Sequence, residues 1–132
     1  PTPTSPKVKN QLFQILPLEV EIKGPIAELG SGWGTLAFAL ARHFPHIQID
    51  AYEISPVPYY TSKFLSYLLH YPNLRLLRQD FFQAPLHSFS LVVCYLYPEA
   101  MNRLKAKFEK ELNRGAFVLS HTFAIPGWTP IQ

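Results

Sequence analysis

Short apolar runs alternate with longer amphipathic segments along this chain. A bounded apolar run of about four to eight residues is typical of a buried strand, whereas apolar residues that recur every three or four positions indicate a helix. This pattern predicts strands at residues 26–29, 48–52, 74–78, 89–95 and 115–120. It predicts helices at residues 35–43, 58–70 and 100–112, and a helix that is short or absent at 81–88. Alternating strands and helices predict an α/β fold with a doubly wound parallel sheet.

Residues 1–24 are predicted to form an arm and a helix ahead of the first strand. Ser5-Pro6 has the form of a helix N-cap followed by the first helical residue. Apolar residues then recur at helical spacing from Val8 to Leu16, and Pro17 ends the pattern. Because a chain of 132 residues fits one domain, residues 1–132 are predicted to form a single domain.

The junction between the first strand and the next helix carries three glycines at alternate positions, Gly30, Gly32 and Gly34. Glycine adopts positive φ angles, and it lets a ligand approach the backbone where a Cβ would block it. The start of the helix adds unpaired N–H groups and the positive end of the helix dipole. This combination is typical of a turn that holds a nucleotide-like ligand.

A carboxylate, Glu53, follows the second predicted strand. Doubly wound folds place the acidic residue that binds a ribose diol about 20 positions after the glycine turn, which is where Glu53 stands relative to Gly32. The pair therefore predicts an adenosine-containing cofactor. The alternative is a plain strand–helix turn with a surface glutamate.

The glycine spacing distinguishes between adenosine cofactors. The chain has Gly-x-Gly-x-Gly, not the G-x-G-x-x-G of dinucleotide-binding folds, and Glu28 stands just before it. A pyrophosphate beside Glu28 would meet a like charge, whereas S-adenosylmethionine carries a sulfonium and an ammonium that a carboxylate attracts. The turn resembles motif I of the class I, Rossmann-like S-adenosylmethionine-dependent methyltransferases, which makes S-adenosyl-L-methionine the expected cofactor.

Other segments resemble a narrower group. They are Pro3-Thr4, YPEAM at 97–101, ELNRGA at 111–116 and TFAIPGW at 122–128. These segments are similar to those of the small protein-lysine methyltransferases that act on the adenine nucleotide translocase and the ATP synthase c subunit, and to those of their bacterial relatives. The resemblance implies strand order 3-2-1-4-5 and N-methylation of a protein lysine. The sequence departs from that group at Trp33, where an acidic residue is usual, and Trp33 either lines the cofactor turn or only packs.

The resemblance also implies roles around the cofactor. Glu28 is expected near the methionine ammonium, Glu53 on both ribose hydroxyls, and Ile54 against the adenine. Asp80 is expected to accept from the adenine amino group with Phe81 against the ring, and a turn or cap role is the alternative for Asp80. The full expected cofactor-binding set is Glu28, Gly30, Ser31, Gly32, Trp33, Gly34, Glu53, Ile54, Asp80, Phe81 and Tyr95.

Methyl transfer from a sulfonium requires neither a metal nor an enzyme nucleophile, because the cofactor is already activated. The enzyme supplies position, alignment and a water-poor pocket. No metal site is predicted. A lysine acceptor must first lose its proton, because its ordinary pKa is about 10.4. The candidate catalytic residues that orient the amine or take its proton are Tyr97, Glu99 and His121, and a structural role is the alternative for each.

The composition of the chain limits which other classes of protein it can belong to. The chain is 48% hydrophobic with a net charge of +3, so it can bury a core. Basic residues between 103 and 114 are interrupted by Glu109 and Glu111, which favours a solvated helix face over a nucleic-acid surface. No apolar run approaches the ~20 residues of a membrane span. The single Cys94 suits a reducing compartment, and a cytoplasmic location is expected.

Two other functions stay open from the residues alone: a degenerate methyltransferase fold without catalysis, and a module that senses NAD or ATP. The glycine spacing favours the methyltransferase. A protein is expected as its substrate and not a nucleic acid, because residues 94–98 lack the Asn/Asp-Pro-Pro-aromatic motif that is frequent in nucleobase methyltransferases. The fifth predicted strand would be an exposed sheet edge, which proteins usually cover or pair. A homodimer contact or residues 126–132 are expected to cover it.

Overall fold

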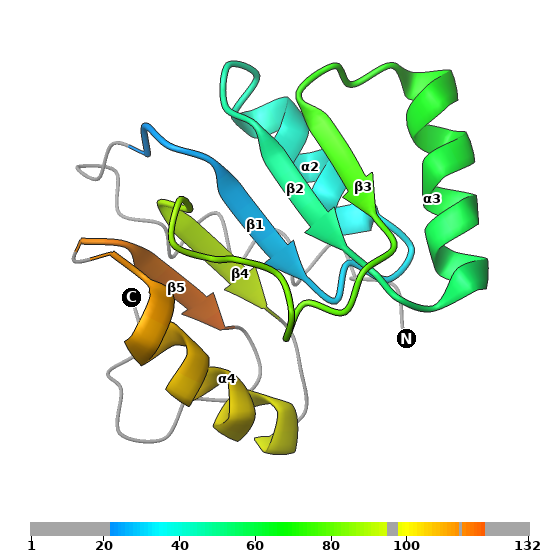
Figure 1. Ribbon diagram of the computed structural model, residues 1–132. Helices are drawn as coiled ribbons and strands as arrows, with labels where there is room; N and C mark the ends of the chain where they lie inside the picture. The colour runs from blue at the N-terminus through cyan, green and yellow to red at the C-terminus, as the bar shows by residue number, and fades with distance from the viewer. Residues whose placement is uncertain (1–21, 95–97, 114, 121–132) are drawn as a thin grey trace.

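The computed structural model describes residues 22–94, 98–113 and 115–120, whose strands form one sheet in the order β3-β2-β1-β4-β5 (Figure 1). The strands are all parallel, and they are β1 (Ile26–Leu29), β2 (Ile49–Tyr52), β3 (Leu74–Leu77), β4 (Leu91–Cys94) and β5 (Phe117–Ser120). The helices are α2 (Thr35–His43), α3 (Pro56–Leu69) and α4 (Pro98–Glu111). The predicted fold class and strand order are confirmed. The helix predicted ahead of Pro17 lies outside the described residues.

β1 and α2 have the predicted boundaries, whereas α4 and α3 each begin two residues earlier and end one residue earlier than the pattern predicts. The physical reason can be seen in α3. It begins at Pro56, whereas the pattern predicts Pro58, because Ser55 is extended and Pro56 suits the first helical position. It ends at Leu69 because His70 adopts a left-handed φ of 59°, from which its N–H donates to the Ser66 carbonyl at 2.8 Å. The strands β2 to β5 are shorter than predicted.

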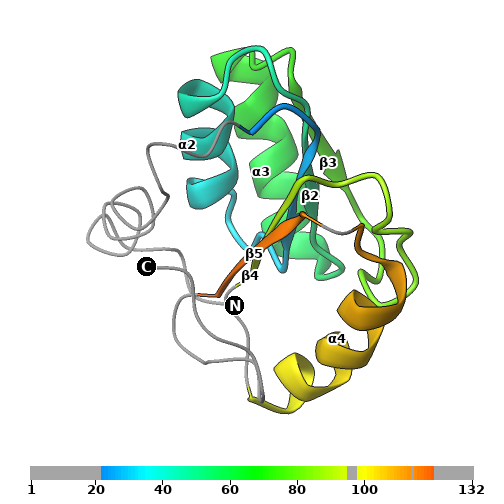
Figure 2. The same cartoon turned by 90° about the vertical axis from the view of Figure 1, so that its left-hand side faces the viewer.

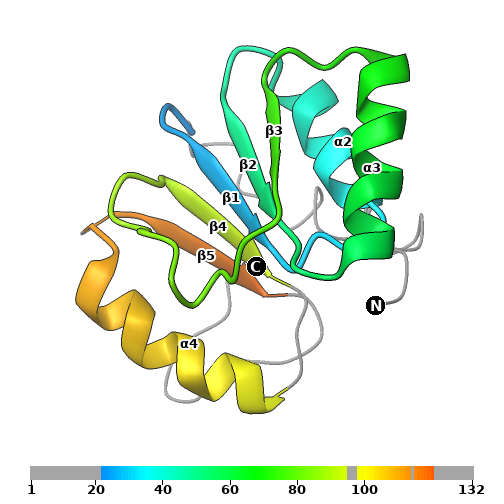
Figure 3. The ribbon, with the colours of Figure 1, turned by 45° about the vertical axis from the view of Figure 1, so that its right-hand side comes forward.

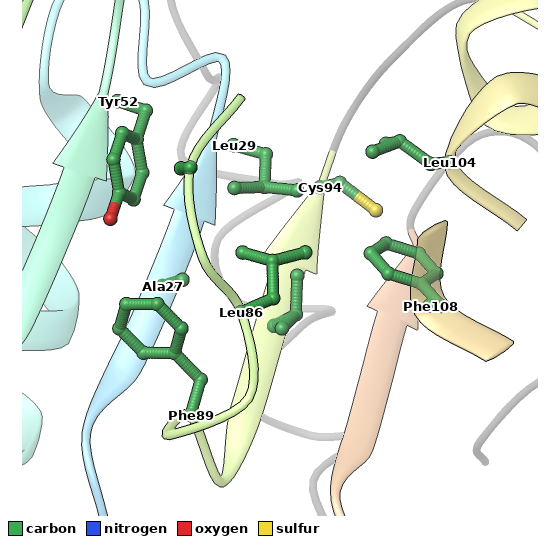
Figure 4. Packing of buried hydrophobic residues seen from close by; sticks show 10 residues of the cluster. Ala27, Leu29, Tyr52, Leu86, Phe89, Cys94, Leu104 and Phe108 are labelled. Carbon is green, nitrogen blue, oxygen red and sulfur yellow. The ribbon is translucent and has the colours of Figure 1, made fainter. Parts of the chain in front are cut away.

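The core lies on both faces of the sheet, because alternate strand residues point to opposite sides. On one face, Ala27, Leu29, Val92 and Cys94 pack with α4, and Figure 4 shows Cys94 directed toward Leu104 and Phe108. On the other face, the buried cluster contains Ile26, Ile49, Leu91, Val93 and Leu119 together with Leu36, Leu40 and Ala41 of α2. Burial on both faces explains why the central strands are nearly all apolar.

The helices form two layers around the sheet. Figures 2 and 3 show α2 and α3 on one face and α4 on the other, with α3 at the β3 margin. The chain passes from β1 to β2 on one side, while β4 pairs with β1 on the other. The carboxyl ends of these strands therefore meet at a topological switch point, where doubly wound sheets bind ligands. Among the described residues, no helix has the length and apolar character to cross a membrane.

Candidate cofactor site

The turn between β1 and α2 is built from glycines with positive φ. The φ angles are 79° at Gly30, 57° at Gly32 and 85° at Gly34. The N–H groups of Gly30 and Ser31 both donate to the Tyr52 carbonyl, at 3.0 and 2.9 Å, which fastens the turn to the end of β2. The predicted glycine conformation is confirmed, and Ser31 is buried within the turn.

Glu53 is fixed by two backbone donors, one from the glycine turn far earlier in the chain and one from Ser55, two residues after it. Its Oε1 accepts from the Gly32 N–H at 2.7 Å, and its Oε2 accepts from the Ser55 N–H at 2.9 Å. A carboxylate offers about four acceptor positions, so these two bonds orient the group and leave acceptor capacity on each oxygen. The residue predicted to bind the ribose is thereby held against the glycine turn and at the start of α3.

Glu28 lies inside β1 and is only 3% exposed. Burial, with a smaller contribution from the negative charge of Glu53, raises the pKa of Glu28 to about 8. Its Oε1 is buried and has no hydrogen-bond partner within the part of the chain that the structure describes. A buried carboxyl oxygen without a partner is energetically unfavourable unless a ligand satisfies it. A primary ammonium, such as that of the cofactor's methionine part, has the required charge and donors.

The apolar side of the site is formed after Glu53. Ile54 leaves 59% of its surface exposed although it is apolar, so its side chain is available for the adenine contact that was predicted. The Nε of Arg78 donates to the Ile54 carbonyl at 3.2 Å, which holds this segment in place. Trp33 is partly buried in the glycine turn, and its contact with the cofactor stays a prediction.

Asp80 has the turn role that was the alternative for it. One of its carboxylate oxygens accepts from the Phe82 N–H at 3.0 Å, and its carbonyl accepts from the Gln83 N–H at the same distance. Phe81 packs against the core on the α4 side. An adenine contact by the other oxygen of Asp80, or by the face of Phe81, stays a prediction.

Ser62 belongs to the site and was not predicted. This α3 residue is 1% exposed, and its hydroxyl donates to the Gly32 carbonyl at 3.2 Å. A Cβ on Gly34 would lie 2.9 Å from the Ser62 Oγ and 3.1 Å from the Phe38 ring. Gly34 therefore serves the close approach of α3 as well as the turn conformation. A small polar residue within an apolar helix was the only signal in the sequence.

The acceptor side of the site is described only in part. Tyr95, Tyr97 and His121 lie outside the described residues. Glu99 is exposed in the first turn of α4, a position where an acidic residue stabilises a helix. Cys94 is buried, which raises the pKa of its thiol to about 12 and makes it unreactive. No cluster of three or more metal-ligating side chains occurs among the described residues.

Curated proteins that are similar in sequence to this chain include two lysine methyltransferases. The lysine N-methyltransferase of the ATP synthase c subunit from Mus musculus is 28% identical over 130 residues, which cover 97% of this chain and 51% of the mouse protein. The chain thus spans about half the length of this curated relative. A protein-lysine N-methyltransferase of Saccharolobus islandicus is 36% identical over 55 residues, which cover 42% of this chain and 34% of the relative.

A solved structure shows the same fold. The RNA methyltransferase from Salinibacter ruber in complex with S-adenosyl-L-homocysteine matches 99% of this chain and 84% of its own chain, with a TM-score of 0.81 and 22% identity. The sequence profile described as the ANTKMT methyltransferase domain matches residues 28–132, from the buried glutamate of β1 onward. The chain belongs to the ANTKMT methyltransferase domain family.

Proposed function

We propose that this chain binds S-adenosylmethionine and transfers its methyl group to the side-chain amine of a protein lysine. The observation that carries the proposal is a pair of acidic side chains at the carboxyl edge of the sheet. Glu53 is oriented by the Gly32 N–H at 2.7 Å, and the buried Oε1 of Glu28 has no partner within the described residues. Together they match the ribose hydroxyls and the ammonium of one ligand.

The bound cofactor supplies a methyl group that is already activated on a sulfonium. The remaining acceptor positions of Glu53 would hold the ribose, Glu28 would hold the ammonium, and Ile54 would cover the adenine. These contacts position the ligand in the glycine turn. Tyr97, Glu99 and His121 stay the candidates for orienting the lysine amine or taking its proton.

A protein lysine is supported by the family and by the names of the relatives in mouse and Saccharolobus islandicus. Two of the four basic residues of α4 are engaged within the protein, which weakens the case for a nucleic-acid surface on this helix. Lys107 pairs with Glu111 at 2.6 Å, and the Arg103 guanidinium lies 3.8 Å from the centre of the Phe82 ring. A cytoplasmic location and a homodimer through the β5 edge are part of the same proposal.

Binding of S-adenosylhomocysteine is expected to raise the melting temperature, because a ligand that binds only the folded state stabilises it. Differential scanning fluorimetry with S-adenosylhomocysteine, NAD and ATP measures this directly. Stabilisation by NAD or ATP alone would contradict the methyltransferase assignment and favour a nucleotide-sensing module.

The acceptor is tested separately. The protein is incubated with a cell lysate and cofactor that carries a tritiated methyl group, and aliquots are then digested with nuclease or protease. Label that protease releases and that amino-acid analysis finds on methylated lysine supports the proposal. Label released only by nuclease would reassign the substrate to nucleic acid.

Cofactor binding is expected to strengthen as the pH rises from about 5.5 to 7.5. Glu28 is protonated in the free protein below its pKa of about 8, and it must lose this proton to pair with an ammonium. Linkage then gives at most about a tenfold change in affinity per pH unit, with up to one proton released per ligand bound. Calorimetry in buffers of different ionisation enthalpy measures that release. Glu28→Gln should weaken binding and abolish its pH dependence, whereas Glu109→Gln on α4 should retain both.

A further inference from the structure

The outward face of α3 is apolar, which reverses the usual pattern of a surface helix. The buried residues of α3 are Pro58, Tyr59 and Ser62. The side chains on the opposite face are large and 57% to 82% exposed, and they are Val57, Tyr60, Phe64, Tyr67 and Leu68. At 3.6 residues per turn these five fall within an arc of about 100°. Figure 3 shows α3 at the outer margin of the fold.

The exposed area is large for a protein of this size. Aromatic and aliphatic side chains of this kind, exposed to this degree, present on the order of 600 Å² of surface. That value is at the upper end for the largest apolar patch of an ordinary monomer, and patches of this size mark interaction sites. The hydroxyl-bearing rings of Tyr60 and Tyr67 suit a boundary between an apolar layer and water.

The charge around this face has one sign. From Ile54 to Gln79 the sequence has no Asp or Glu, but it has Lys63, Arg75 and Arg78. Arg75 pairs with Asp50 at 3.0 Å. Lys63 and Arg78 form no ion pair within the described residues and instead lie near tyrosine rings of α3. Lys63 and Arg78 therefore flank the apolar face as cations that no carboxylate of the described residues balances, whereas Arg75 is balanced by Asp50.

A groove of about 460 Å³ lies between the C-terminal half of α3 and the β3 edge. Its lining includes the basic side chains of Lys63 and His70 together with Tyr67, and that of Arg75, which is already paired with Asp50; no acidic residue lines it. The groove adjoins the outward face of α3 because Tyr67 belongs to both. An anionic group bound there would lie beside the apolar side chains.

We propose that the outward face of α3 docks on a bilayer surface that contains anionic lipids. The five apolar side chains enter the interfacial layer, and phosphate headgroups lie against Lys63 and the groove. A second copy of the chain fits less well, because pairing two α3 faces would bring like-charged flanks together without an acidic residue on either side. Anionic lipids supply the opposite charge. The proposal does not depend on the identity of the methyl acceptor.

Vesicle flotation of the full chain tests this inference with two matched pairs of substitutions. The test pair, Phe64→Gln with Leu68→Gln, changes the outward face. The control pair, Leu65→Gln with Leu69→Gln, changes two exposed apolar residues that have the same spacing but lie about 100° further around the helix. With vesicles of phosphatidylcholine and phosphatidylserine, the test pair should lower the partition coefficient at least about tenfold. The control pair should lower it by no more than about twofold, and salt should weaken binding of the unsubstituted chain.

Sedimentation velocity and thermal melting of each variant show whether a second copy of the chain or another segment of the same chain covers the outward face of α3 instead. Absence of flotation by the unsubstituted chain, or an equal loss for both pairs, overturns the proposal. A dimer that the test pair alone dissociates would assign the face to a second copy. A lower melting temperature for the test pair alone, without vesicle binding by the parent, would assign it to another segment of the chain.

Discussion

Replacing Glu53 with Gln should weaken S-adenosylhomocysteine binding by about 100-fold or more. Both carboxylate oxygens accept backbone N–H groups, at 2.7 Å from Gly32 and 2.9 Å from Ser55. The carboxamide nitrogen of Gln must therefore face one of these donors, and the ribose also loses its charged acceptor. Hydrogen bonds to a charged group contribute about 1.5–3 kcal/mol each, so the loss of the ribose contacts accounts for the expected effect.

Isothermal titration calorimetry measures the affinity, and far-UV circular dichroism checks that the variant folds. Glu109→Gln is the matched control, because it makes the same chemical change at an exposed position of α4. Its affinity should stay within about twofold of the parent. A folded Glu53→Gln protein with unchanged affinity would mean that another residue holds the ribose.

Gly34→Ala should lower the free energy of unfolding by about 2–5 kcal/mol. The φ of 85° at Gly34 is strained for an L-residue, and the added methyl would lie 2.9 Å from the Ser62 Oγ and 3.1 Å from the Phe38 ring. Overpacking of that kind adds about 1–3 kcal/mol to a backbone strain of about 1–2 kcal/mol. Urea denaturation gives the difference directly.

Gly115→Ala separates the two contributions. Gly115 has a similar φ of 95°, but a Cβ there meets nothing within 4 Å. Its replacement should therefore show the strain alone, about 1–2 kcal/mol. Equal losses for the two variants would mean that α3 moves away from the turn at no energetic cost, and the contact between Gly34 and Ser62 would then lose its assigned importance.

The site residues that could be predicted are those fixed by sheet topology. The parallel register places Tyr52 beside Leu29, so the residues that follow β1 and β2 emerge at the same edge. Spacing along the chain was therefore enough to associate Glu53 with the glycine turn. The acidic character of Glu28 suggested a cationic ligand, but its burial and its raised pKa depend on the packing of both sheet faces, which no local pattern contains.

The orientation of α3 could not be predicted from its periodicity. Large apolar residues occur nearly all around this helix, so the sequence predicts a helix without indicating which side meets the sheet. The close approach of Ser62 to Gly32 and Gly34 decides it, and only small side chains fit there. The outward position of Phe64 and Tyr67 follows from that contact.

Strand order has a consequence for the way this chain folds. Ile26 pairs with Ile49 on one side and with Leu91 on the other, so joining β4 to β1 closes a much longer loop than joining β2 to β1. Longer loops lose more chain entropy on closure, and non-local pairings slow folding. The half that contains Glu28, the glycine turn and Glu53 therefore assembles from nearer contacts, whereas β4 and β5 dock on it from a greater distance along the chain. During synthesis, the half of the sheet that holds the cofactor residues would therefore form before β4 and β5 are added to it.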